Sequence, residues 1–176
     1  MDTSTLENIA EDYISHQLQQ NTILVAKPKN DRKGTDLLAF SEMDDGVKFC
    51  RIQSKGRSFS KSENTHIEIP QAYVSNGFIV FLYLVYDERD YELYVFFPSD
   101  IEQWNVTKKD EYQLNLSISN AKTKLDFYKF DSNKVSLIRT LIANAETHGE
   151  FNRLIYGKCE GVISGFISGN GSGEVK

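Results

Sequence analysis

At 176 residues, with 40% hydrophobic and 26% charged residues, the chain is long enough for one domain with a full hydrophobic core, and its composition excludes a mainly disordered protein. No run approaches the roughly 20 apolar residues of a membrane helix, and the acidic, polar first residues do not resemble a signal peptide. We therefore expect a cytoplasmic protein. A net charge of -5 argues against a protein that coats nucleic acid indiscriminately.

The charge is unevenly distributed along the chain. Residues 27–61 are richer in basic than in acidic side chains, whereas the remainder is acidic. This segment is either a phosphate-binding face on an acidic body or a solvated loop rich in lysine. Cys50 and Cys159 are far apart and lack metal-ligand spacing, so we expect both to be reduced and structural.

The first third of the chain predicts one helix and three strands. Apolar residues recur at helical spacing over residues 4–20, which predicts an amphipathic helix with one buried stripe. A short buried strand at 22–28 and a turn at 30–34 follow. Residues 35–40 and 47–55 then predict two strands joined by a hairpin turn.

The rest of the chain predicts further strands and a late helix. Residues 65–70 are extended, residues 71–77 form a turn or one helical turn, and residues 78–86 and 91–97 pair as a hairpin rich in β-branched and aromatic side chains. A short helix is predicted at 98–104, edge strands at 112–118 and 125–130, and an amphipathic helix at 132–149 that Gly149 ends. The expected architecture is an α/β (α+β) sandwich around one mixed sheet, with a single domain at 1–158 and a Gly/Ser-rich tail at 159–176.

Polar side chains interrupt the two strands of the first hairpin. Asp36 begins one strand, and Gln53 and Lys55 lie on one face near the end of the next. Pairing of these strands would bring the three together. A carboxylate and an amide oxygen are ligands for a hard cation such as Mg²⁺, and a nearby ammonium can orient water or stabilise charge on a phosphate, so the group predicts metal-assisted phosphodiester hydrolysis.

These segments resemble the PD-(D/E)XK nuclease superfamily. The resemblance covers Glu7, the stretch Gly34-Thr35-Asp36-Leu37-Leu38 and the stretch Ile52-Gln53-Ser54-Lys55-Gly56-Arg57, roughly the first 60 residues. It implies a restriction-endonuclease-like core. It also implies that Asp36 and Gln53 hold Mg²⁺ or Mn²⁺, that Lys55 is catalytic, and that Glu7 assists as a further ligand.

The sequence departs from the superfamily pattern at three places. Thr35 stands where proline is usual, Gln53 replaces an acidic ligand, and the polar residues 56–77, with Pro70, follow the lysine strand where a helix is usual. The first is a common variation. The uncharged Gln53 would bind a metal more weakly.

Each candidate also has a structural interpretation. Glu7 could complete a capping box with Ser4, with Glu11 one turn later as the substitute acid. From the helical wheel we expect Glu7 to face inward more than Glu11. Asp36 could cap its own loop, and Gln53 and Lys55 could form a solvent-facing strip on an edge strand.

The sequence is compatible with three functions. The first is a metal-dependent nuclease acting on DNA, with Lys33, Arg51 and Arg57 contacting the phosphate backbone. The second is a catalytically inactive module of the same fold that binds nucleic acid or a protein partner. The third is an interaction protein in which Asp36, Gln53 and Lys55 point in different directions. A homodimer or a partner protein is possible for the first two, and no membrane association is expected.

Overall fold

The computed structural model describes residues 3–29, 33–44, 46–87, 89–145, 153–154 and 166–167. The predicted tail at 159–176 lies outside these ranges except for Phe166–Ile167, as does the predicted helix stop at Gly149. Within them, no helix is long and apolar enough to cross a membrane.

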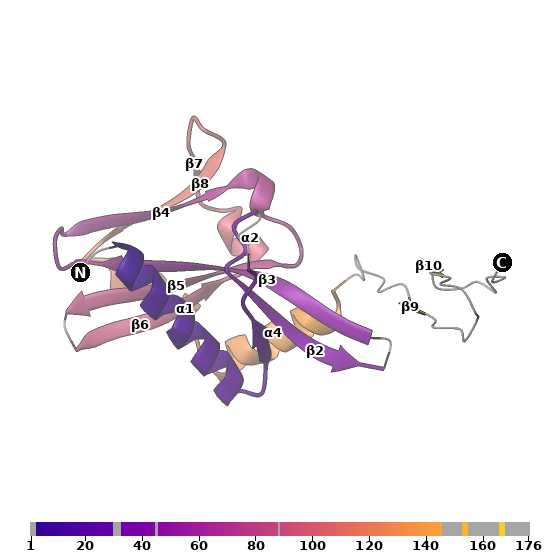
Figure 1. Cartoon of the computed structure of the whole chain (residues 1–176). Helices are drawn as coiled ribbons and strands as arrows, with labels where there is room; N and C mark the ends of the chain where they lie inside the picture. Colours follow the sequence, from indigo (N-terminus) through magenta and orange to yellow (C-terminus); the bar gives the residue numbers. More distant parts are fainter. Residues whose placement is uncertain are drawn as a thin grey trace.

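A five-stranded mixed sheet forms the centre of the molecule (Figure 1). Its order is β1-β2-β3-β5-β6, with β1 at Leu24–Ala26, β2 at Leu37–Met43, β3 at Gly46–Ser58, β5 at Phe78–Asp87 and β6 at Asp90–Phe96. β3 and β5 run parallel and every other neighbouring pair runs antiparallel. The predicted hairpins and the predicted mixed sheet are confirmed.

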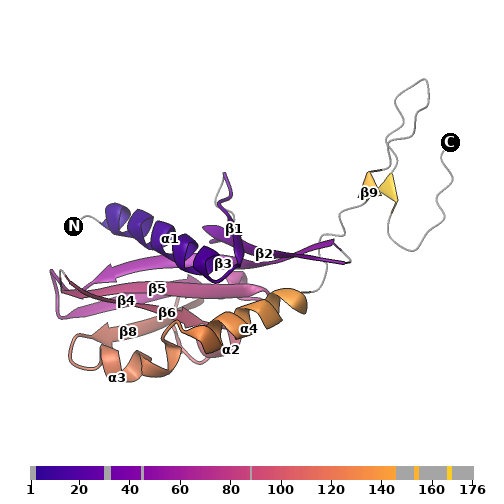
Figure 2. The same ribbon diagram turned by 90° about the horizontal axis from the view of Figure 1, so that it is seen from below.

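Two helices pack on one face of this sheet. Helix α1 (Thr3–Gln20) buries the stripe Leu6, Ala10, Ile14 and Leu18, as its periodicity predicts. Helix α4 (Ser132–Ala143) contributes Val135, Ile138 and Ile142 to the same hydrophobic cluster. Figure 2, the view from below Figure 1, shows α1 lying next to β3.

A second, three-stranded sheet covers the opposite face, which differs from the single sheet expected. Its order is β4-β8-β7, formed by Asn64–Pro70, Glu111–Ser117 and Asn105–Val106. Its inner side chains join those of β5 and β6, α2 (Pro98–Ile101) and α3 (Ala121–Leu125) in a separate hydrophobic cluster. The strand predicted at 112–118 therefore exists, but it pairs with β4 outside the main sheet.

Two further predicted boundaries are wrong. Residues 125–130 form the end of α3 and a 3-10 turn, η2 (Asp126–Tyr128), with a single β-bridge between Lys129 and Tyr94. Aromatic residues in that segment pack against the sheet without joining its ladder. Helix α4 ends at Ala143, where Asn144 donates its backbone N–H to the carbonyl oxygens of Thr140 and Ile142.

Another 3-10 turn, η1 (Gln71–Tyr73), and two short strands, β9 (Arg153–Leu154) and β10 (Phe166–Ile167), complete the described elements.

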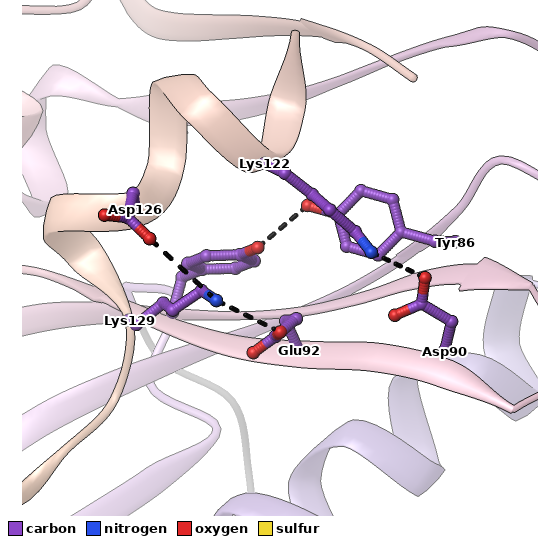
Figure 3. Close-up of polar contacts among 7 residues, drawn as sticks. Tyr86, Asp90, Glu92, Lys122, Asp126 and Lys129 are labelled. Atoms are coloured by element: carbon purple, nitrogen blue, oxygen red, sulfur yellow. Dashed lines mark hydrogen bonds and ion pairs between the residues drawn. The ribbon is translucent and has the colours of Figure 1, made fainter. Parts of the chain in front are cut away.

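Polar contacts fasten the second layer to the end of the β5–β6 hairpin (Figure 3). The buried hydroxyls of Tyr86 and Tyr94 lie 2.8 Å apart, and burial raises the pKa of Tyr94. Lys122 of α3 pairs with Asp90 at 2.7 Å, and its ammonium lies 4.8 Å from the Tyr86 ring centroid. The Lys122 contacts link α3 to the end of the hairpin, whereas the Tyr86–Tyr94 hydrogen bond lies within it.

Helix α1 crosses β3 at Gly56, and the crossing requires a residue without a side chain. A Cβ at this position would lie 2.7 Å from the Leu6 carbonyl oxygen. Gly56→Ala is therefore expected to lower the free energy of unfolding by about 1–3 kcal/mol in urea titrations. Gly77→Ala, whose Cβ would meet nothing within 4 Å, is the control and should stay close to the wild type. Equal stability of the two variants would contradict the close crossing.

Burial of Cys50 makes stability depend on alkaline pH. It raises the pKa of the thiol from 9.0 to about 12, so the unfolded chain ionises first as pH rises. The contribution of the protonated Cys50 thiol to the free energy of unfolding is fully present below pH 9.0. It is lost as pH rises from 9.0 to about 12. The wild type should lose up to about 1.4 kcal/mol more than Cys50→Ala for each pH unit in that range. Urea titrations at several pH values check this, and parallel losses in both proteins would refute it.

Candidate functional site

The site forms where β2 and β3 separate. Their antiparallel register runs from Met43 opposite Gly46 to Leu37 opposite Ile52, and then β3 continues to Ser58 beside β5. Extending the register by one residue places Asp36 directly opposite Gln53, as the hairpin spacing predicted. The β2-side edge of β3 is therefore open to side chains from residue 53 onward.

Asp36 caps this open edge. Its backbone N–H donates to the Ile52 carbonyl at 2.9 Å, and its carboxylate Oδ2 accepts the backbone N–H of Ser54 at 2.7 Å. A hydrogen bond between a carboxylate and a buried amide is stronger than one between neutral groups. Asp36 thus has a structural role, and its side chain is held in one place beside β3.

Gln53 presents a buried oxygen without a hydrogen bond. The residue is only 7% exposed, and among the described residues its Oε1 has no hydrogen-bond partner. The amide lies against Gly34, where a Cβ would be 2.9 Å from Nε2 and 2.7 Å from the Tyr73 ring. An unsatisfied buried acceptor costs about 1–3 kcal/mol, so this oxygen is a favourable place for a cation to bind.

Lys55 lies two residues beyond Gln53 and faces the same way. In the parallel ladder Gln53 pairs with Val80 and Lys55 pairs with Leu82. The side chains of Val80 and Leu82 face the second sheet. Ser54 and Gly56 point to the other face, toward α1. Gln53 and Lys55 therefore share one face of β3, and Asp36 lies opposite Gln53, whereas the third hypothesis expects the three side chains to point in different directions.

Two acidic residues of α1 reach toward this edge, and both are paired with cations. Glu7 Oε1 forms an ion pair with the Arg57 guanidinium at 3.3 Å, and Glu11 forms an ion pair with Lys27. The Glu11 side chain is 15% exposed and that of Glu7 is 40% exposed. The expectation that Glu7 faces further inward is therefore wrong, because the helix turns its Glu11 side toward β1 and the loop that precedes Asp36.

Lys27 was not among the predicted site residues. The hydrogen bond and charge of Glu11 raise the pKa of Lys27, with smaller contributions from Asp12 and Asp36. Its ammonium is thus paired with Glu11, the more buried of the two acids of α1. Lys27 directly follows the short strand β1 and belongs to no motif, so only tertiary structure reveals its place beside Glu11.

The predicted phosphate contacts differ in their availability. Arg51 donates to the Tyr73 carbonyl at 2.8 Å and to Ser75 Oγ at 2.9 Å, and burial lowers the pKa of its guanidinium. Arg57 donates to the carbonyls of His66 and Gly56. Lys33 is exposed in the loop before Asp36. Both arginines hold the local fold, while Lys33 faces solvent.

A metal ion at this site would need mixed ligands. The described ranges contain no group of three or more His, Cys, Asp or Glu residues close enough to hold a metal. The Asp36 carboxylate and the Gln53 Oε1, which lacks a hydrogen bond among the described residues, are oxygen donors of the kind that suits Mg²⁺ or Mn²⁺ better than a softer ion. Waters and a phosphate oxygen commonly complete such coordination.

Comparison with known proteins supports the fold. No family model and no curated protein matches this chain. Among solved structures, it is similar to the bacterial homing endonuclease I-Ssp6803I, with 17% identity and a TM-score of 0.51 over 81% of this chain and 95% of that one. It is also similar to a Holliday junction resolvase from Archaeoglobus fulgidus, with 10% identity and a TM-score of 0.45 over 74% and 94% of the two chains.

The chain has the restriction-endonuclease-like fold that the PD-(D/E)XK resemblance implied. The departure expected after the lysine strand is also explained. Residues 64–70 form β4 and residues 71–73 form η1, so a strand and a short turn occupy the place of a helix before β5.

Gly34 leaves room for the Gln53 amide and the Tyr73 ring. Its φ of +64° favours glycine, and a side chain would press on both Gln53 and Tyr73. Gly34→Ala should lower the free energy of unfolding by about 1–3 kcal/mol. Asparagine tolerates this backbone angle. Gly34→Asn should still lower the free energy of unfolding at least as much, because its side chain would press on Gln53 and Tyr73. Urea titrations measure both, and near-wild-type stability of Gly34→Asn would assign the whole cost to the backbone.

Proposed function

We propose that this protein is a nuclease that hydrolyses phosphodiester bonds in DNA with the help of Mg²⁺ or Mn²⁺. The observation that carries the proposal is the meeting of Asp36 and Gln53 across the end of one hairpin, with the Gln53 Oε1 buried and lacking a hydrogen bond to the described residues. Lys55 follows on the same face. This grouping supports phosphodiester chemistry better than a structural role alone.

Each residue of the group has a distinct role in the proposal. Asp36 and Gln53 would hold the metal ion through their oxygens, with Asp36 also fixing β3 through Ser54. When bound, the metal ion lowers the pKa of a water and offsets charge on the phosphate. Lys55 would orient the attacking water or donate hydrogen bonds to the phosphate oxygens as negative charge increases there.

The acids of α1 would act after exchanging their present partners. Glu7 would serve as a further ligand of the metal ion, which requires release of Arg57. Glu11 is less exposed, and its partner Lys27 also feels the charge of Asp36, so Glu11 is the alternative acid. Lys33 would contact the DNA backbone, as would Arg51 and Arg57 where their remaining N–H groups allow.

A second function is favoured by the charge state of the site. Gln53 is neutral, and both helix acids are already neutralised by basic partners. These features suit a nuclease-fold module that binds nucleic acid without cutting it. The two functions share a DNA-binding surface and differ in whether the site hydrolyses the bound strand.

The discriminating assay is nicking of supercoiled plasmid and of branched DNA with Mg²⁺ or Mn²⁺. The wild type should cut at least one substrate, and Asp36→Asn and Lys55→Gln should each lose about 100-fold or more of that activity. Asp36→Asn is chosen because its amide oxygen can still accept the Ser54 N–H, which protects the fold.

The control is Lys122→Gln, which removes an ammonium near β6, at the opposite edge of the sheet from β1 and β2. It should cut like the wild type. Retained cutting by Asp36→Asn and Lys55→Gln would overturn the assigned site. DNA binding without cutting by the wild type under all conditions would favour the non-catalytic module.

A further inference from the structure

The outer face of the second sheet carries a regular polar surface. Along β4 and β8, side chains alternate between the hydrophobic cluster and solvent. The solvent-facing pairs are Asn64 opposite Ser117, His66 opposite Asn115 and Glu68 opposite Gln113. We call these six residues the polar ladder. The intervening residues Ile67, Ile69, Leu114 and Leu116 are buried, which fixes the register and keeps the polar ladder outward.

The polar ladder consists of hydrogen-bonding groups in fixed positions. Gln113 donates to Glu68 at 2.6 Å, and Asn115 donates to Gln113 at 3.1 Å. Asn64, His66 and Asn115 are exposed, and they line a surface depression of about 480 Å³ with residues from both strands. These contacts order side chains on a rigid sheet while leaving donors and acceptors directed to solvent.

We propose that the polar ladder reads base edges in the major groove of duplex DNA, an inference that rests on DNA being the ligand of the proposed nuclease. Strand β7 pairs only with Tyr112 and Gln113 of β8, so β4 and β8 continue beyond Gln113 as a two-stranded β-ribbon. A ribbon of this kind fits the major groove, which is about 12 Å wide. Asn and Gln pair with adenine, a carboxylate accepts from cytosine, and serine contacts any base. The polar ladder supplies each of these groups in cross-strand register.

Lysines at both ends of the ribbon, which stand beside Glu63, Asp110 and Glu111, supply cations that a nucleic acid can meet. Lys61 precedes β4, and Lys124 donates to the Asn115 carbonyl at the same end. Lys108 and Lys109 are exposed in the turn before β8 at the other end. Phosphates on the two sides of a groove would meet these ammonium groups. The polar ladder itself has no apolar anchor of the kind that protein interfaces use.

The ribbon is fastened to the strand that carries the candidate site. Arg57 of β3 donates through Nε to the His66 carbonyl of β4 at 2.9 Å. Arg57 lies only two residues beyond Lys55, a distance of roughly 7 Å along the strand. The backbone of β4 at His66 is therefore held close to the segment of β3 that carries Lys55. Figure 1 shows β4 and β8 side by side over the main sheet.

The test is selection of bound sequences from a library of random duplex DNA in EDTA, so that no strand is cut. The wild type should enrich a sequence motif. His66→Ala and Asn115→Ala should each reduce the preference at one or a few base pairs by about tenfold. Both residues are exposed, so the fold should be retained. Gln19→Ala, which removes an exposed amide from α1, is the matched control and should keep the wild-type motif.

Three results would overturn the inference: an unchanged motif in both variants, wild-type binding without sequence preference, or no binding of duplex DNA. The plasmid assay separates this inference from the proposed function. Cutting by the wild type together with an unchanged motif in the variants would reject the polar ladder and keep the nuclease. Relaxed motifs without cutting by any protein would keep the polar ladder and make the chain a DNA-binding module.

Discussion

The structure depends on the separation of β2 from β3 after the pair formed by Leu37 and Ile52. Backbone amides that leave a sheet need new acceptors, because a buried N–H without one is costly. The Asp36 carboxylate meets that need by accepting the Ser54 N–H. Because a side chain, and not strand β2, accepts this N–H, the edge of β3 is exposed there and Asp36 lies beside Gln53. The constraint of backbone hydrogen bonding thus places the candidate site.

Two hydrophobic clusters, one on each face of the main sheet, then determine what surrounds that edge. On one face, helix α1 approaches β3 closely because Gly56 has no side chain. The opposite face is covered by the β4-β8-β7 sheet only in part, and Gln53 and Lys55 point to that side. The site therefore lies at a junction between helix, main sheet and second sheet. Gln53 and Lys55 come from strand β3 and Asp36 directly precedes β2, which suits precise positioning of a ligand.

Charge pairing explains why a segment rich in lysine and arginine does not present a simple basic face. Arg51 and Arg57 donate to carbonyls of the surrounding loops, and Lys27 is paired with Glu11. Much of the local positive charge therefore supports the fold and neutralises acids near Asp36. The exposed Lys33 and the lysines flanking the polar ladder are then the cations best placed to meet a polyanion. Function at this site would require exchange of ion pairs that the resting protein already makes.

Local patterns in the sequence determined α1, the β2–β3 and β5–β6 hairpins and the neighbourhood of Asp36, Gln53 and Lys55, because apolar periodicity and short loops are local properties. Only tertiary structure decided the second sheet, since β4 and β8 are distant in sequence and either could have joined the main sheet. It also decided that Phe127 and Tyr128 belong to a 3-10 turn rather than a strand, and that Glu11 lies further inward than Glu7. These outcomes depend on which surfaces of distant segments bury one another, and that information is not contained in any single stretch of chain.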